Sequence, residues 1–79
     1  MKKSLFVIEQ SGGSFEDSWK HLNNWGFTTY EKAEKFLFSR HWKRTKGYSG
    51  IIYESMLPDI DEYYDPYMAR IIEINYWEN

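Results

Sequence analysis

The sequence predicts an α+β fold in which one α-helix packs on one face of a small antiparallel β-sheet, in the order ββαββ. Three observations lead to this prediction. The chain has 79 residues and no cysteine, so residues 1–79 are expected to form one domain that folds without disulfides. Segments rich in β-branched and aromatic residues lie toward both ends of the chain. One segment between them has the capping and charge pattern of a helix.

Two strands are predicted before the helix. Residues 4–10, SLFVIEQ, have the composition of a strand. The SGGS that begins at Ser11 predicts a hairpin turn, because paired glycines readily adopt positive φ angles. Residues 15–21 then alternate between two faces, which predicts a second, antiparallel strand. We expect this strand to end in a turn that pivots on Gly26.

The helix is predicted over residues 29–46. Thr28 and Glu31 have the spacing of a capping box, in which each side chain accepts a hydrogen bond from the backbone amide of the other residue. Basic residues follow toward the far end, where the helix dipole favours positive charge, and Gly47 is the expected stop.

The apolar residues of this helix do not form a single stripe. At about 100° per residue, Ala33, Phe36 and Leu37 share one face, which we assign to the core. Phe38 and Trp42 are one turn apart and form a ridge that points nearly opposite Ala33. This ridge is either covered by the chain that follows the helix, or it is an exposed aromatic patch that binds a partner.

Two strands are predicted after the helix, at residues 50–56 (GIIYESM) and residues 69–77 (ARIIEINYW). The connection between them contains Pro58 and Pro66, which cannot donate to a strand ladder, so we predict a long loop there. Loops of this length in compact domains are usually functional or disordered.

Charge is distributed unevenly along the chain. Residues 1–49 carry nine basic and five acidic side chains, a net charge of +4, whereas residues 50–79 carry one basic and seven acidic side chains, a net charge of −6. Four of these carboxylates lie in residues 58–68, PDIDEYYDPYM, together with three tyrosines and no basic residue. Residues 58–68 are named the acidic segment below.

The acidic segment is the main candidate for a partner-binding site. Tyrosine is favoured in interfaces because its ring provides contact area and its hydroxyl a hydrogen bond. A row of carboxylates complements a basic groove on a partner, including a groove built for nucleic acid. The alternative is a solvated loop whose acids pair with the basic residues of the Arg40–Lys46 run. The candidate residues are Asp59, Asp61, Glu62, Tyr63, Tyr64, Asp65 and Tyr67, with Trp42 as a second patch.

Two other functions stay open. The run from Arg40 to Tyr48 interleaves basic and aromatic side chains, which is the chemistry of a site for single-stranded nucleic acid. The net charge of −2 opposes such binding, so we expect no nucleic-acid partner. A homodimer that pairs an exposed strand edge with its own copy is the third candidate. The nucleic-acid site would consist of Arg40, Trp42, Lys43, Arg44, Lys46 and Tyr48.

No catalytic, cofactor or metal site is expected. The acidic segment and the residues after it depart from a calcium-binding loop at Tyr63, Tyr64 and Arg70, where an oxygen ligand, a glycine and a glutamate are needed. Zinc sites built on cysteine are excluded, and the sequence contains no nucleophile or metalloprotease motif. No apolar run approaches the roughly 20 residues that span a bilayer, so we expect no membrane partner.

The chain as a whole resembles small phage-encoded accessory proteins. The resemblance is carried by a strand at the N-terminus, a second strand that contains Trp19, the segment GFTTYEKAEKFL that opens the helix, and the closing segment ARIIEINYWE. Proteins of this kind are often early host-takeover or anti-defence factors that bind and inhibit a bacterial protein. The resemblance therefore implies a non-catalytic inhibitor of a host protein in the cytoplasm of a bacterium. The acidic segment lies outside the resemblance.

Overall fold

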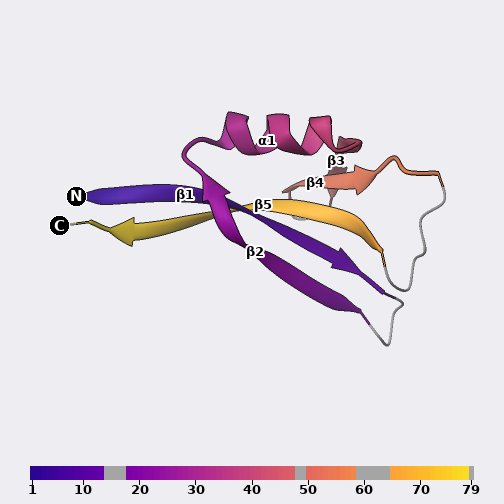
Figure 1. Ribbon diagram of the computed structural model, residues 1–79, viewed down its shortest axis with the longest axis horizontal. Helices are drawn as coiled ribbons and strands as arrows, with labels where there is room; N and C mark the ends of the chain where they lie inside the picture. Colours follow the sequence, from indigo (N-terminus) through magenta and orange to yellow (C-terminus); the bar gives the residue numbers. More distant parts are fainter. Residues whose placement is uncertain (14–17, 48–49, 59–64, 79) are drawn as a thin grey trace.

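The chain forms one antiparallel sheet and one helix in the computed structural model, which describes residues 1–13, 18–47, 50–58 and 65–78 (Figure 1). The predicted α+β class and the ββαββ order are confirmed, with one further strand inserted after the helix. The elements of the described residues are β1 (Lys2–Gly12), β2 (Trp19–Phe27), α1 (Tyr30–Ser39), β3 (Trp42–Gly47), β4 (Gly50–Ser55) and β5 (Pro66–Trp77).

The strands lie in the order β2-β1-β5-β4-β3, and all neighbouring pairs are antiparallel. β1 and β5 are the two longest strands of the sheet, and at one end of this pair Lys2 lies opposite Trp77. The Met1 amine donates to the carbonyl of Glu78 at 2.8 Å, so the two ends of the chain lie side by side (Figure 1). The two strands that are most distant in sequence therefore form the centre of the sheet.

Helix α1 covers one face of this sheet (Figure 1). Ala33 and Leu37 are fully buried, which confirms the face of the helix that we assigned to the core. They pack toward Ile8 of β1 and Ala69 of β5, both 1% exposed. The core cluster consists of Ile8, Leu37, Trp42, Tyr53 and Ala69, with Phe27, Phe36 and Ile71 packed against it.

The predicted end of the helix is wrong. Helix α1 ends at Ser39, and the residues expected to form its last two turns are β3 instead. The amide of Arg40 donates to the carbonyl of Leu37 at 3.0 Å, which tightens the last turn. His41 then has a φ of 66°, in the left-handed region, and this turns the chain out of the helix. Gly47 is the last residue of β3 and not a helix stop.

The predicted exposed patch at Trp42 is also wrong. Trp42 is 7% exposed and belongs to the core cluster. In a continuing helix its side chain would point nearly opposite Ala33 and away from the sheet, so burial of this large ring favours the strand. Phe38 stays 47% exposed and does not share a ridge with Trp42.

The helix begins one residue later than the predicted capping box implies. Thr29 is the N-cap, with extended backbone, and its Oγ1 accepts from the amide of Lys32 at 3.2 Å. Thr28 Oγ1 accepts only from the exposed Lys32 side chain, also at 3.2 Å. The position three residues after the cap is therefore Lys32, so the box with Glu31 does not form.

Strand β2 lies farther along the chain than predicted. Gly26, the expected turn pivot, lies within β2, and a Cβ there would come to 2.8 Å from Leu5 Cγ. The β1–β2 register shifts between Val7 and Glu9, which marks a bulge. Of the strand predicted at 15–21, residues 15–17 lie outside the described residues.

The two strands predicted after the helix are confirmed as β4 and β5. β5 begins three residues earlier than expected, at Pro66. Proline is tolerated there, because the first residue of a strand need not donate a backbone hydrogen bond to the neighbouring strand. Residues 59–64 of the acidic segment lie outside the described residues.

We expect Thr29→Ala to lower the free energy of unfolding by about 1 kcal/mol, because it removes the side-chain acceptor of the cap. Thr28→Ala is the matched control and should cost much less, since its hydroxyl contacts only an exposed ammonium group. Urea melts of the two variants decide the matter. A larger loss of unfolding free energy for Thr28→Ala than for Thr29→Ala would show that Thr28 is the N-cap, as the predicted capping box requires.

Candidate functional site

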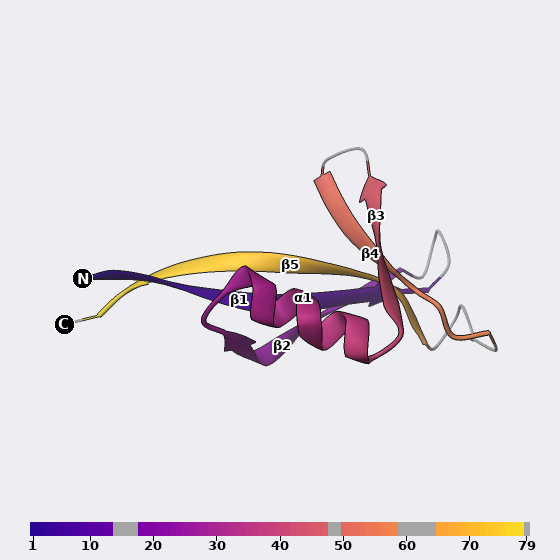
Figure 2. The ribbon, with the colours of Figure 1, turned by 90° about the horizontal axis from the view of Figure 1, so that it is seen from above.

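The β3–β4 hairpin joins the rest of the sheet, among the described residues, at two pairs: Tyr53 with Ala69, and Glu54 with Met68. Beyond these pairs β4 turns away from β5, and Figure 2 shows the hairpin running at a steep angle to the other strands. β5 continues from Arg70 to Trp77 with β1 on one side and, within the described chain, no strand on the other. Residues Arg70–Trp77 are named the open edge.

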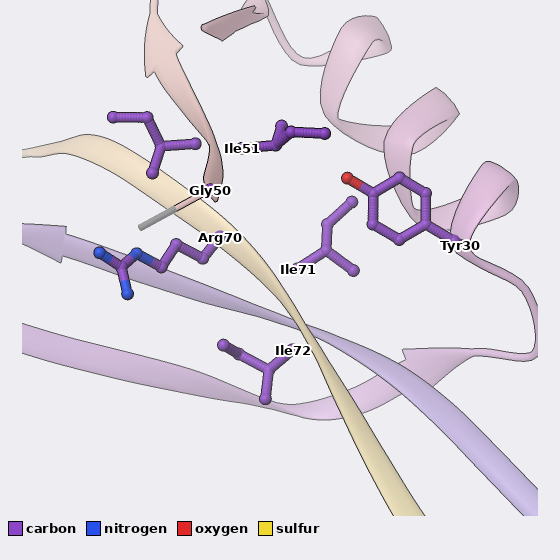
Figure 3. Close-up of a pocket in the computed structure, with 7 residues that line it drawn as sticks. Tyr30, Gly50, Ile51, Arg70, Ile71 and Ile72 are labelled. Carbon is purple, nitrogen blue, oxygen red and sulfur yellow. The ribbon is translucent and has the colours of Figure 1, made fainter. Parts of the chain in front are cut away.

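A groove of about 500 Å³ opens where β4 and β5 separate (Figure 3). Its side chains are apolar apart from one tyrosine and one arginine. Because β4 and β5 are not paired with each other here, the groove presents strand edges as well as side chains, as in sites that accept an extended chain. The groove is lined by Tyr30, Gly50, Ile51, Ile52, Arg70, Ile71 and Ile72.

The residues that line the groove lie on both faces of the sheet. Ile71 pairs with Ile8 and points toward the helix, where Figure 3 shows it beside Tyr30. Arg70 pairs with Glu9 and points to the face away from the helix. Arg70 makes no ion pair with any of the described residues. The groove therefore offers an apolar wall on the helix side and a free cation on the other side.

The face away from the helix has no second layer in the described part of the chain. The cross-strand pairs Leu5–Ile74 and Val7–Ile72 lie on it. Val7 is only 3% exposed, but Ile74 and Tyr76 are 37% and 42% exposed. An apolar stripe therefore runs along β5, beside the open edge, toward the end of the chain.

A buried tyrosine anchors the hairpin beneath the helix. Tyr53 is fully buried, and its hydroxyl contacts the Glu34 carboxylate at 2.5 Å and the Tyr30 hydroxyl at 2.8 Å. Glu34 also accepts from Arg44 Nη1 of β3 at 3.5 Å. Burial, and then the hydrogen bond to Glu34, raise the pKa of the Tyr53 phenol well above its ordinary value of 10.0. This network links the hairpin to the helix, and within it the Tyr53 hydroxyl is buried and bonded to both Glu34 and Tyr30.

Of the predicted partner-binding residues, the structure describes Asp65, Tyr67 and Trp42, and the other five lie outside the described residues. Asp65 is exposed directly before β5. Tyr67 is 38% exposed, and its hydroxyl donates to the carbonyl of Gly13 at 3.2 Å. The C-terminal part of the acidic segment is thereby fixed to the end of β1.

Two exposed apolar residues precede the acidic segment and were missed by the sequence analysis. Met56 and Leu57 are each 52% exposed. Their backbone is nevertheless fixed, because the Met56 amide donates to the carbonyl of His41 at 2.8 Å. The sequence signal for this exposed pair was a Met-Leu dipeptide directly before Pro58. It was missed because residue 56 was predicted to belong to a strand.

The basic run does not form a stacking platform. Arg44 bonds to Glu34, and Lys43 lies 4.0 Å from Glu54. The Arg40 guanidinium lies over the Phe36 ring, 5.0 Å from its centre. These three cations already have contacts within the domain. Of the two rings of the predicted nucleic-acid site, Trp42 is buried and Tyr48 lies outside the described residues.

The described residues contain no group of three or more His, Cys, Asp or Glu side chains placed to hold a metal ion. Nor do they contain a helix long and apolar enough to cross a membrane. Comparison with known proteins found no matching family model, curated protein or solved structure.

We expect Tyr53→Phe to lower the free energy of unfolding by about 1–3 kcal/mol at neutral pH, because Glu34 loses a hydrogen-bond donor. The folded state keeps the phenol neutral, whereas the unfolded chain ionises it near its ordinary pKa of 10.0. The stability that Tyr53 provides is therefore complete below this pH and is lost as the pH rises above it.

Urea melts from neutral pH to about pH 12 measure this difference. Tyr53→Phe should show a weaker fall in stability at alkaline pH than the wild type. Tyr76→Phe, at an exposed tyrosine, is the control and should behave as the wild type. Equal alkaline slopes for the wild type and Tyr53→Phe would contradict the assigned network.

Proposed function

We propose that the chain is a non-catalytic protein-binding module that inhibits a bacterial host protein and binds it through the connection between β4 and β5. One observation carries the proposal. Large apolar side chains are exposed at both ends of the acidic segment, although the backbone there is held in place. Met56 and Leu57 lie before the segment and Tyr67 lies near its end, with exposures of 52%, 52% and 38%.

The chemistry of this connection suits an interface with a basic protein. Apolar and tyrosine side chains provide contact area that is desolvated on binding, and the carboxylates between them steer a positively charged surface. Lys43 and Arg44, two of the cations that could have neutralised the segment, contact Glu54 and Glu34 instead.

Inhibition of a host protein rests on the resemblance to phage-encoded accessory proteins, which act by binding. The buried Tyr53 network is consistent with a binder, because the strongly perturbed ionisable group in the domain is fully bonded and inaccessible. The alternative function, binding of single-stranded nucleic acid, is weakened by the burial of Trp42. A ring inside the core cannot stack on a base.

We expect replacement of Asp59, Asp61 and Asp65 by Asn, together with Glu62→Gln, to leave the fold intact and to slow association with the partner. The charges act at long range, so their loss should lower the on-rate and reduce its dependence on salt. Tyr67→Ala should instead raise the off-rate, because it removes contact area.

The experiment is a capture from bacterial lysate with mass spectrometry, followed by binding kinetics of the captured protein at two salt concentrations. The variant Asp59→Asn is compared with Glu31→Gln, which changes the net charge equally at an exposed site on the helix. Equal on-rates for these two variants would contradict the proposed site. A large fall in melting temperature of the fourfold variant would show instead that the acids are structural.

We expect no measurable binding of DNA or RNA at physiological salt, because the net charge is −2 and Lys43 and Arg44 of the basic run are paired with Glu54 and Glu34. A mobility shift with single-stranded oligonucleotides at low and moderate salt measures this. Salt-sensitive binding that disappears when Lys43 and Arg44 are replaced would establish the alternative function.

A further inference from the structure

The open edge of β5 is long, and apart from the charged side chains of Arg70 and Glu73 it has no protection. Over Arg70–Trp77 the backbone groups that point away from β1 meet no strand of the described chain. Such edges attract other strands, and proteins usually block them with lysine, proline or a bulge. The open edge contains no lysine and no proline, and its register with β1 is regular throughout.

The other open edges of the described sheet do carry such protection. β3, the last strand on one side, has three basic residues among its six. β2, the last strand on the other side, has a bulge opposite Val7–Glu9. The part of β1 that extends beyond β2 begins with Lys2 and Lys3. The absence of protection at β5 is therefore a local exception, which is expected where a partner strand binds.

We propose that this partner is a second copy of the chain, whose β5 pairs antiparallel with β5 of the first copy around a two-fold axis. The two sheets would then join into one continuous sheet. This interface is separate from the connection between β4 and β5 and does not depend on the function proposed above. The β3–β4 hairpin runs at a steep angle to β5 (Figure 2), and the groove separates it from Arg70–Ile72, so a strand can approach the open edge between them.

Charge selects the register of this pairing. In an antiparallel pair around a two-fold axis, residues of the same face meet, and one residue lies opposite its own copy. At the middle of the open edge this residue is Glu73 or Ile74. Glu73 would place two carboxylates directly opposite each other, which is unfavourable. Ile74 places two apolar side chains together, with Ile72 opposite Tyr76 of the second copy, and so continues the apolar stripe of the uncovered face.

In the register centred on Ile74, the second copy also fills the mouth of the groove. Trp77 of the second copy comes opposite Ile71, on the helix side of the sheet. Trp77 is 73% exposed in the single chain, a large ring that a partner would be expected to cover. The groove wall at Ile71 is apolar and includes the Tyr30 ring and Ile51 (Figure 3). The exposed Trp77 ring of one copy and the apolar groove of the other are thus complementary in this arrangement.

Opposite charges also meet in this arrangement. Glu78 of the second copy comes toward Arg70, on the face away from the helix. Arg70 has no ion pair within the described chain, and the Glu78 carboxylate lies 3.0 Å from the Lys3 ammonium group, with both side chains about half exposed. By the two-fold symmetry this contact occurs twice. Charge complementarity therefore favours a second copy over an unrelated extended peptide.

Sedimentation velocity at several protein concentrations tests the proposal. We expect the wild type to sediment as a dimer that dissociates on dilution. Ile74→Lys places two ammonium groups across the axis and should sediment as a monomer. Leu22→Lys is the matched control, since Leu22 lies on the same face, on β2, and is 47% exposed. It should remain a dimer. A monomeric wild type, or an Ile74→Lys variant that dimerises as the wild type does, would overturn the proposal.

Cross-linking tests the register without relying on a disruptive variant. The chain has no cysteine, so Ile74→Cys introduces a single thiol next to its own copy. Directly opposed residues of an antiparallel pair are close enough for a disulfide. We expect Ile74→Cys to form a covalent dimer on mild oxidation, much faster than Leu22→Cys. Equal rates for the two variants would show that Ile74 does not lie at the axis.

Discussion

Among the described residues, the β3–β4 hairpin is fixed to the rest of the domain by two buried side chains, Trp42 and, above all, Tyr53. The Tyr53 ring lies in the core, its strand position pairs with Ala69, and its hydroxyl joins the helix through Glu34 and Tyr30. The arrangement holds the hairpin without a long β4–β5 ladder, so β4 is free to leave the sheet after two pairs. The groove and the open edge of β5 both result from this divergence.

The two proposed interaction surfaces lie toward opposite ends of β5. The connection from β4 enters at Pro66, beside the end of β1, whereas the open edge runs from Arg70 to the end of the strand (Figure 1). Pairing of two copies along the open edge would place the Pro66 ends of the two β5 strands at opposite ends of the joined sheet. A dimer of this kind could bind two sites on a partner assembly, with the gain in avidity that linkage provides.

Local patterns in the sequence were sufficient for the fold class, for three strands and for the buried helix face at Ala33 and Leu37. They failed at the end of the helix, because Phe38 and Trp42 have helical spacing and the basic residues between them suit a helix C-terminus. What ends the helix is tertiary: Trp42 is buried only if the chain reverses at His41. The open edge could not be predicted either, since it depends on where β4 leaves β5. The acidic segment was found because charge is visible in sequence, whereas the exposure of Trp77 is not.

Backbone hydrogen exchange of β5, followed residue by residue by NMR at high and low protein concentration, tests most directly whether the open edge is paired with another strand. The account predicts that the amides of Arg70–Trp77 that point away from β1 exchange slowly at high concentration and quickly on dilution. The β5 amides bonded to β1 should stay protected at both concentrations. Outward-pointing amides that exchange quickly at every concentration would contradict the account.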